Sequence, residues 1–181
     1  MRSPLSAVLF VLVLLGAPSL ASAYDHLFAV PVVRPNGGGS WVVNDGSEPG
    51  VAFHAPVGAM LGWSGSGLGR LLDSTPFLLP EIGYELRSTT NHRSDVFSGG
   101  FGVGYGIFAF AIVSYTPRFL VGRSDGQTAV GFRHSIAGHF LLSVVYLELS
   151  HQVLRAGGVT NQDIQLCGGL NLGTLLIPSF W

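Results

Sequence analysis

Strict alternation between apolar and polar or small side chains constrains this fold more than any other sequence feature. In residues 80–88 one face of an extended chain would be apolar, with Pro80, Ile82, Tyr84 and Leu86. The opposite face would hold Glu81, Gly83, Glu85 and Arg87. Successive side chains of a β-strand point to opposite sides of the sheet, so a period of two predicts strands. Residues 80–88 are therefore predicted to form a strand with one apolar face and one face that carries ionised side chains.

The same alternation recurs along the chain and predicts an all-β fold. Further segments lie at 51–63, 97–107, 111–121, 130–136, 145–150 and 164–173, with a shorter one at Phe28, Val30 and Val32. Together with 80–88 they make eight predicted strands. The joints at 36–50, 88–95, 123–127 and 155–163 are polar and rich in glycine, whereas those at 64–79, 108–110 and 138–144 are more apolar. Joints of two kinds in alternation indicate an up-and-down antiparallel barrel.

The low charge favours a transmembrane barrel over a soluble sandwich. Only 10% of the residues are charged, against about 25% in typical soluble domains. A soluble sheet needs polar groups on its outward face, but here the less apolar faces carry mostly Gly, Ala, Ser and Thr. A membrane barrel reverses the two faces, with apolar side chains toward lipid and polar or small ones inside. A soluble secreted β-barrel that binds an apolar ligand remains the alternative.

Six charged residues lie on the predicted inner faces and define the candidate site. They are three acids and three bases: Glu81, Glu85, Arg87, Arg118, Arg133 and Glu148. The interior of an eight-stranded barrel is just wide enough for side chains to fill it, and buried charges are tolerated when they are paired. We therefore expect a closed lumen plugged by salt bridges. A narrow channel or small-solute transporter is the alternative within the membrane class.

The first 23 residues are predicted to be a cleaved secretory signal peptide. Arg2 precedes an apolar run at 7–17, and Ala21-Ser22-Ala23 forms a small-residue cleavage site before Tyr24. The apolar run is shorter than the roughly 20 residues of a spanning helix. Residues 24–181 would then form a single barrel domain outside the cytoplasm. The formal net charge of −1 does not indicate a nucleic-acid partner, and the single cysteine, Cys167, is expected to be a packing residue.

In these features the chain resembles the small outer-membrane β-barrel proteins of Gram-negative bacteria, of the OmpA-like eight-stranded type. The signal peptide, the alternation across 26–177 and the terminal aromatic residue Trp181 carry the resemblance. It implies a place in the outer membrane, contact with outer-membrane lipid and recognition by the barrel-assembly machinery during insertion. It leaves the oligomeric state open. The chain departs from the family pattern at Pro31 and Pro56, which fall inside predicted strands, and at Pro178, which interrupts the last one.

Aromatic residues near strand ends are predicted to form interfacial girdles. They are Trp63, Phe108, Phe110, Phe140, Tyr146, Phe180 and Trp181.

The histidines and serines do not predict catalysis. Lipid hydrolases of outer-membrane barrels hold a His and a Ser two residues apart on one strand, on the same surface. Here His134 and Ser135 are adjacent, as are Ser150 and His151, so each pair would point to opposite sides. We expect both histidines to face lipid near strand ends.

No cofactor or metal site is expected either. The histidines and acids lack zinc-type spacing, and the glycines of 100–106 lie within a strand pattern, which does not fit a phosphate-binding loop. These glycines are expected on a crowded inner wall. The sequence thus predicts a non-catalytic protein with a structural, adhesive or loop-presenting role.

Overall fold

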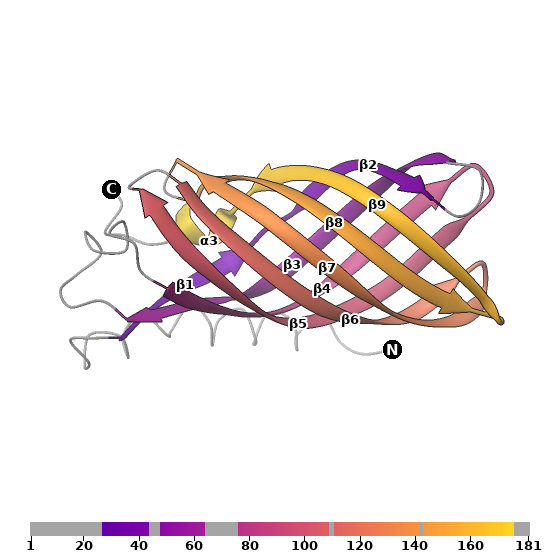
Figure 1. Cartoon of the computed structure of the whole chain (residues 1–181), viewed down its shortest axis with the longest axis horizontal. Helices are drawn as coiled ribbons and strands as arrows, with labels where there is room; N and C mark the ends of the chain where they lie inside the picture. Colours follow the sequence, from indigo (N-terminus) through magenta and orange to yellow (C-terminus); the bar gives the residue numbers. More distant parts are fainter. Residues whose placement is uncertain (1–26, 44–47, 64–75, 109–110, 142, 176–181) are drawn as a thin grey trace.

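The computed structural model describes residues 27–43, 48–63, 76–108, 111–141 and 143–175 (Figure 1). The predicted signal peptide and the terminal aromatic residues lie outside these ranges. The described chain contains one short helix, α3 (Leu172–Leu175), and nine strands. The strands are β1 (Leu27–Val33), β2 (Asn36–Val42), β3 (Pro49–Trp63), β4 (Pro76–Thr89), β5 (Arg93–Phe108), β6 (Ala111–Ser124), β7 (Gln127–Phe140), β8 (Val145–Ala156) and β9 (Val159–Leu170).

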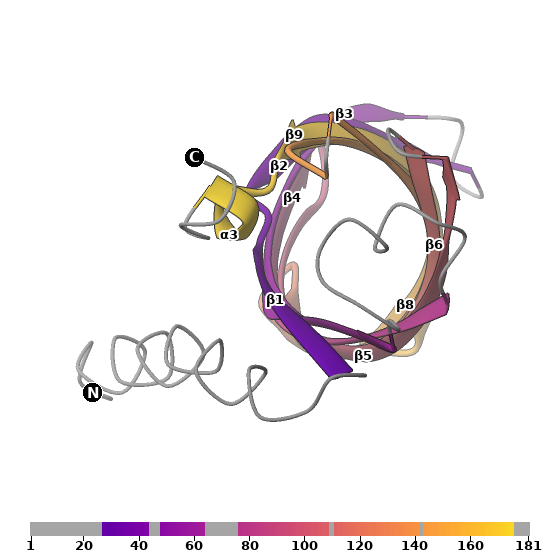
Figure 2. The same cartoon turned by 90° about the vertical axis from the view of Figure 1, so that its left-hand side faces the viewer.

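The strands form one antiparallel sheet that closes on itself. Consecutive strands from β2 to β9 pair with each other, and β9 pairs with β2 to complete a ring (Figure 2). The up-and-down antiparallel order and the all-β class predicted from the sequence are thus confirmed, and the closed ring is consistent with a β-barrel.

The ring is staggered, as closed sheets require. Following paired residues once round from Leu61 returns to β3 at Val51, ten residues away. The path runs through Leu78, Val103, Tyr115, Ile136, Leu149, Leu166 and Gly39. With this stagger, eight positions around the ring and ordinary strand spacings, the strands tilt by about 40° from the axis.

The prediction of eight strands is wrong by one, because the first strand position is split in two. Both β1 and β2 pair with β3 in one uninterrupted register, so they occupy a single place in the ring. The split falls at Arg34-Pro35. The Arg34 N–H donates to the Pro56 carbonyl (3.0 Å), but Pro56 has no N–H to return the bond. The Arg34 carbonyl accepts instead from the Tyr146 hydroxyl (2.8 Å).

The two ends of the ring differ, and we name them by their contents. The turn end carries the turns that join β4 to β5, β6 to β7 and β8 to β9, whereas the helix end carries α3 (Figure 1). Turns at the turn end are shorter than the loops that the sequence predicted. Asp125-Gly126 and Gly157-Gly158 make two-residue hairpins with positive φ at both positions, and β2 occupies half of the predicted loop 36–50.

At the helix end, α3 lies outside the ring and covers β1 (Figure 2). β9 ends at Leu170, so it does not reach the free edge of β1. The Asn171 side chain accepts a hydrogen bond from the Val33 N–H on that edge (3.2 Å). The chain therefore protects an exposed edge with a side chain and a helical turn. The prediction of a last strand at 164–173 is therefore wrong at its C-terminal end, because β9 ends at Leu170.

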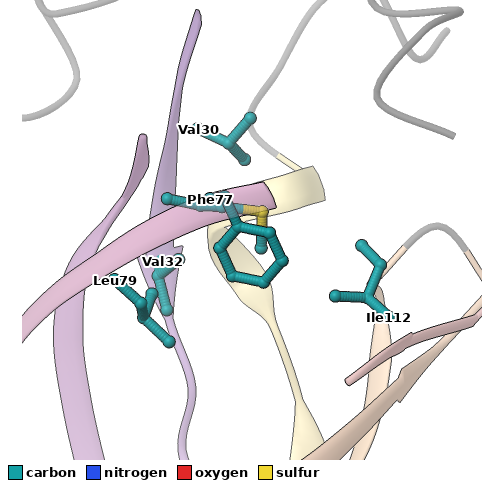
Figure 3. Packing of buried hydrophobic residues seen from close by; sticks show 6 residues of the cluster. Val30, Val32, Phe77, Leu79 and Ile112 are labelled. Carbon is teal, nitrogen blue, oxygen red and sulfur yellow. The ribbon is translucent and has the colours of Figure 1, made fainter. Parts of the chain in front are cut away.

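Two apolar clusters lie within the ring. The larger one joins β1, β3, β4 and β6 near the helix end (Figure 3). Its members are Val30, Val32, Met60, Phe77, Leu79 and Ile112. A smaller one near the turn end consists of Val96, Leu120, Ala129 and Leu154. The apolar face predicted for the first strand therefore points inward. Val30 and Val32 lie on the same side of the chain as Arg34, whose side chain is buried inside the ring.

Between the clusters the interior is polar, while the outer wall is apolar. Outward side chains such as Val51, Phe132 and Leu147 are 66%, 58% and 50% exposed. Inward side chains include Glu85 at 4% and Arg133 at 0%. Globular proteins in water place apolar groups inside and charges outside. This ring has the opposite arrangement over most of its height.

Candidate functional site: the charged interior of the ring

All six charged residues predicted for the site are buried inside the ring. Their side chains come from β4 (Glu81, Glu85, Arg87), β6 (Arg118), β7 (Arg133) and β8 (Glu148). Each has the strand parity opposite to the apolar outward residues, so the pleat alone directs these side chains inward. The structure brings five of them into one network and places Arg87 in a separate pair.

Arg118 is the centre of this network. Its Nη1 and Nη2 atoms donate to the two carboxylate oxygens of Glu148, at 3.1 and 3.2 Å, in a bidentate pair. Its Nε atom donates to Glu81. Two strands that are not neighbours in the ring, β4 and β8, are thus joined to β6 through one guanidinium group.

The network extends from Arg118 in both directions. Glu148 also faces Arg133 at 3.6 Å, and Arg133 Nη1 lies 2.6 Å from Glu85 Oε2. At the other end Glu81 pairs with Arg34. The result is a continuous chain of alternating charges, in the order Arg34, Glu81, Arg118, Glu148, Arg133, Glu85.

A separate ion pair, between Arg87 and Asp163, lies nearer the turn end. With it, the interior of the described ring holds four arginines and four carboxylates. The formal charges cancel. A buried set of ions is tolerable when it is balanced and hydrogen-bonded, so this balance allows the ring to keep ionised groups in its interior.

Sequence reasoning missed Arg34, Asp163 and His54 as members of the site. Arg34 lies beyond the short strand predicted at Phe28, Val30 and Val32, and Asp163 falls in the predicted loop 155–163. His54 lies on the less apolar face of 51–63, and its Nε2 atom is 3.6 Å from Glu85. Counting charges gives no signal for the missing members, because the six predicted residues already balance as three acids and three bases.

Neutral polar side chains fill the space around Arg133. Its Nη2 atom donates to Ser150 Oγ (2.9 Å) and to Gln165 Oε1 (2.6 Å). Gln165 in turn donates to Gln152 Oε1 (3.4 Å). Glycines on β5 leave room for other inward side chains: a Cβ on Gly100 would lie 2.8 Å from Arg118 Cγ, and one on Gly104 would meet the Phe77 ring at 2.0 Å.

A buried chain of hydroxyl and imidazole groups lies toward the helix end. His139 Nε2 is 2.9 Å from Ser114 Oγ, and His139 Nδ1 is 3.2 Å from Ser143 Oγ. The His139 ring stacks on the Tyr146 ring, with 5.9 Å between their centroids. Arg34 Cζ lies 5.2 Å from the centroid of the Tyr146 ring. All of these side chains are buried. Tyr146 therefore does not belong to an interfacial girdle, as the sequence predicted, but to the interior.

The serine–histidine pairs considered in the sequence do not meet. His134 is exposed on the outer wall, whereas Ser135 is buried inside and accepts from Arg118. His134 and His151 are paired residues on neighbouring strands, and both are exposed. They lie in the middle of β7 and β8, not near strand ends as expected. The Tyr115 hydroxyl lies 2.8 Å from His134 Nδ1 and gives this imidazole a polar partner on the outer wall.

The turn end is held by hydrogen bonds between neighbouring turns. The Asp125 carboxylate accepts from the Arg93 N–H (2.8 Å) and lies 2.9 Å from His92 Nδ1. Partial burial raises the pKa of Asp125, but these two hydrogen bonds outweigh it, and the pKa of this carboxyl is lower than its usual value. Glu48 similarly accepts from the Asn91 N–H (3.0 Å) and from Thr89 Oγ1 (3.2 Å).

Comparisons with protein-family models, curated proteins and solved structures find no match for this chain. Among the residues that the structure describes, no helix has the length and apolar character needed to cross a membrane, and no group of three or more possible metal ligands is found.

Proposed function

We propose that this protein is an outer-membrane β-barrel with a structural, non-catalytic role, whose lumen is closed by a network of buried ion pairs. The observation that supports this proposal is the placement of polarity about the closed ring. Apolar side chains cover the outer wall, and balanced charges fill the interior. In lipid, apolar outward residues gain a favourable environment, and ring closure pairs the strand edges within the sheet, apart from the edge of β1 that Asn171 and α3 cover.

The distribution of polarity argues against the soluble alternative. A soluble barrel that binds an apolar ligand needs an apolar interior and a wettable outer surface. Here the largest fully buried side chains include Arg34, Arg133 and Tyr146, while exposed positions hold rows of Phe, Val, Leu and Ile. Exposed apolar patches of this extent mark interaction surfaces or membrane contact.

Among the non-catalytic roles expected, a structural role agrees best with the short turns at the turn end. Adhesion or recognition by loops needs long segments that vary on a rigid scaffold. Two hairpins at the turn end have two-residue turns, and Asp125 ties the turn between β6 and β7 to that between β4 and β5. These turns offer little surface for a partner.

The interior favours a closed barrel over a channel. Arg118 and Arg133 reach carboxylates on other strands, so the charges cross the lumen instead of lining an open path. A channel for ions or solutes would need polar groups that face water along its length.

A gel-shift test on cell fractions addresses the proposal directly. The full chain is expressed with residues 1–23, the predicted signal peptide, and the outer-membrane fraction is extracted with detergent. Samples are then run on a denaturing gel with and without boiling. We expect the protein in the detergent extract, with an unboiled band that migrates differently from the boiled one. A protein recovered in aqueous buffer, with one unchanged band, would overturn the proposal.

A further inference from the structure

The arginines of the described chain divide into two groups by the side of the wall on which they lie. Arg34, Arg87, Arg118 and Arg133 are buried inside the ring. Arg93, Arg123 and Arg155 are exposed and share the parity of the outward apolar residues. These three lie at the turn end of β5, β6 and β8, respectively. In the described residues, every outward-facing arginine is thus found at one end of the ring.

The outward arginines stand where the apolar wall stops. Val121 precedes Arg123 on the outer face of β6, and Val153 precedes Arg155 on that of β8. Polar partners lie beside them: Thr128 is paired with Arg123, and Thr160 with Arg155. In a membrane barrel, this is the height at which lipid tails give way to headgroups.

Neither Arg123 nor Arg155 forms an ion pair in the part of the chain that the structure describes. Asp95 is paired with Arg123 across β5 and β6, but its carboxylate contacts Arg93, at 3.7 Å. Arg123 and Arg155 flank β7, because Arg123 is paired with Thr128 and Arg155 with Val130. Two strand spacings and an offset of two residues along β7 separate their Cα atoms, which is about 12 Å. Two unpaired guanidinium groups at this spacing can hold one headgroup between them.

The opposite wall at the same height has a different character. There β2 presents Trp41, Val43 follows the end of β2, and β3 presents Val51, all of them exposed. No arginine faces outward from β2, β3 or β4 in their described residues. The positive charge is therefore confined to one side of the turn end, from β5 to β8, and does not form a uniform collar.

We propose that Arg123 and Arg155, assisted by Arg93, form a binding site for the phosphate groups of membrane-lipid headgroups on the outer wall at the turn end. The guanidinium fork matches the oxygens of a phosphate group and binds it in a bidentate manner. Apolar side chains directly below the site contact the tails of the same lipid. The site would also orient the barrel, with its turn end in the leaflet that carries the phosphate-bearing lipid. This inference rests on the proposed membrane location.

The test compares lipids that differ in headgroup charge. Protein folded in detergent micelles is mixed with dioleoyl phosphatidic acid or with dioleoyl phosphatidylcholine, and lipids that remain bound are counted by native mass spectrometry. We expect the wild-type protein to retain the phosphatidic acid at least fivefold more than the phosphatidylcholine. The double variant Arg123→Gln/Arg155→Gln should lose this preference, and Arg123→Lys/Arg155→Lys should keep most of it because it preserves both charges.

Two further arms identify the source of the phosphate and separate this inference from the proposed membrane location. Inorganic phosphate at equal concentration should not displace the bound lipid, and displacement would show a site for free anions instead. Equal retention of both lipids by the wild-type protein would overturn the inference. The gel shift on boiling is recorded for every sample: its loss in the wild type would count against the barrel proposal itself, whereas a shift without lipid preference would count against the arginine site alone.

Discussion

Glu148 is the residue on which the interior network depends most. Its two oxygens accept from both terminal nitrogens of Arg118, and Arg133 lies 3.6 Å away. A single carboxylate thus offsets two buried guanidinium groups, each of which also contacts one other acid, Glu81 or Glu85. Removing a partner from a buried ion pair is costly because the remaining charge stays in a poorly solvated place.

The variant Glu148→Gln tests this dependence. It keeps the shape of the side chain and removes its charge, which leaves the interior with one unbalanced arginine. We expect the free energy of unfolding in detergent micelles to fall by about 3–5 kcal/mol, measured by urea titration. The matched control is Arg93→Gln, since the Arg93–Asp95 pair is exposed and should contribute less than about 1 kcal/mol. Equal effects of the two variants would show that the interior network does not stabilise the ring.

Asp125 makes the stability of the fold depend on pH, and the direction of its pKa shift gives the sign of this dependence. Because its folded-state pKa lies below the usual value, the carboxylate contributes stability above the pKa of the unfolded chain, about 3.9. This contribution is lost as the pH falls through the folded pKa. Asn tolerates the positive φ of position 125 (51°), so Asp125→Asn removes the charge without straining the turn.

Acid unfolding of the wild type and Asp125→Asn checks this sign. Unfolding is followed by circular dichroism in micelles between neutral and acidic pH. We expect the wild type to lose more stability than the variant between about pH 5 and pH 2, with the two curves converging at the acid end. Parallel curves across this range would mean that the hydrogen bonds of Asp125 make no net contribution to stability.

Among the elements, β5 best displays how the two faces of one strand differ. Gly99 points outward, and a Cβ placed there meets nothing within 4 Å. Gly100 points inward, and a Cβ there would lie 2.4 Å from the Pro117 carbonyl oxygen. Adjacent glycines in one strand therefore serve different purposes: only the inner one is required by its neighbours.

Alanine substitution at these two positions is a matched experiment. Gly100→Ala should lower the free energy of unfolding by about 1–3 kcal/mol, because β5 and β6 must separate to admit the methyl group. Gly99→Ala should be neutral or slightly stabilising, since it restricts the unfolded chain and meets no obstacle. Urea titration in micelles measures both. The opposite order of effects would mean that the faces of β5 are assigned the wrong way round.

The elements also show what the sequence could and could not predict. Period-two patterning predicted strands at the places of β3 to β9, with the bounds of β9 too far along the chain, because one face of each of these strands is largely apolar. It also predicted the inward parity of Glu85 and Arg133. It failed at β1, where Val30 and Val32 are as apolar as the outer wall but belong to an interior cluster. The break at Arg34-Pro35 depends on Pro56, twenty-odd residues further along the chain, and such a contact leaves no local pattern.

At the scale of the whole molecule, ring size and side-chain volume together decide whether the lumen is open. Eight strand positions leave an interior that side chains can just fill. Here arginine side chains fill it, because they reach across it to carboxylates on other strands. Arg118 contacts acids on both β4 and β8, and so does Arg133. Since these charges neutralise one another inside the ring, an ion that entered would have to break pairs before it found a partner.

A planar-bilayer recording tests the closed lumen. We expect no steady conductance from the wild-type protein at moderate voltage, because the paired side chains block the path. The double variant Arg118→Ser/Glu148→Ser removes the central pair without changing the net charge, and it should admit water and produce discrete openings. Phe132→Leu, a change on the outer wall, is the control and should stay silent. Each variant must first show the gel shift on boiling, so that unfolded protein is not mistaken for a pore. Steady conductance in the wild type would contradict the closed lumen, and silence in the double variant would mean that other side chains, such as Arg133 and Gln165, block the path without the central pair.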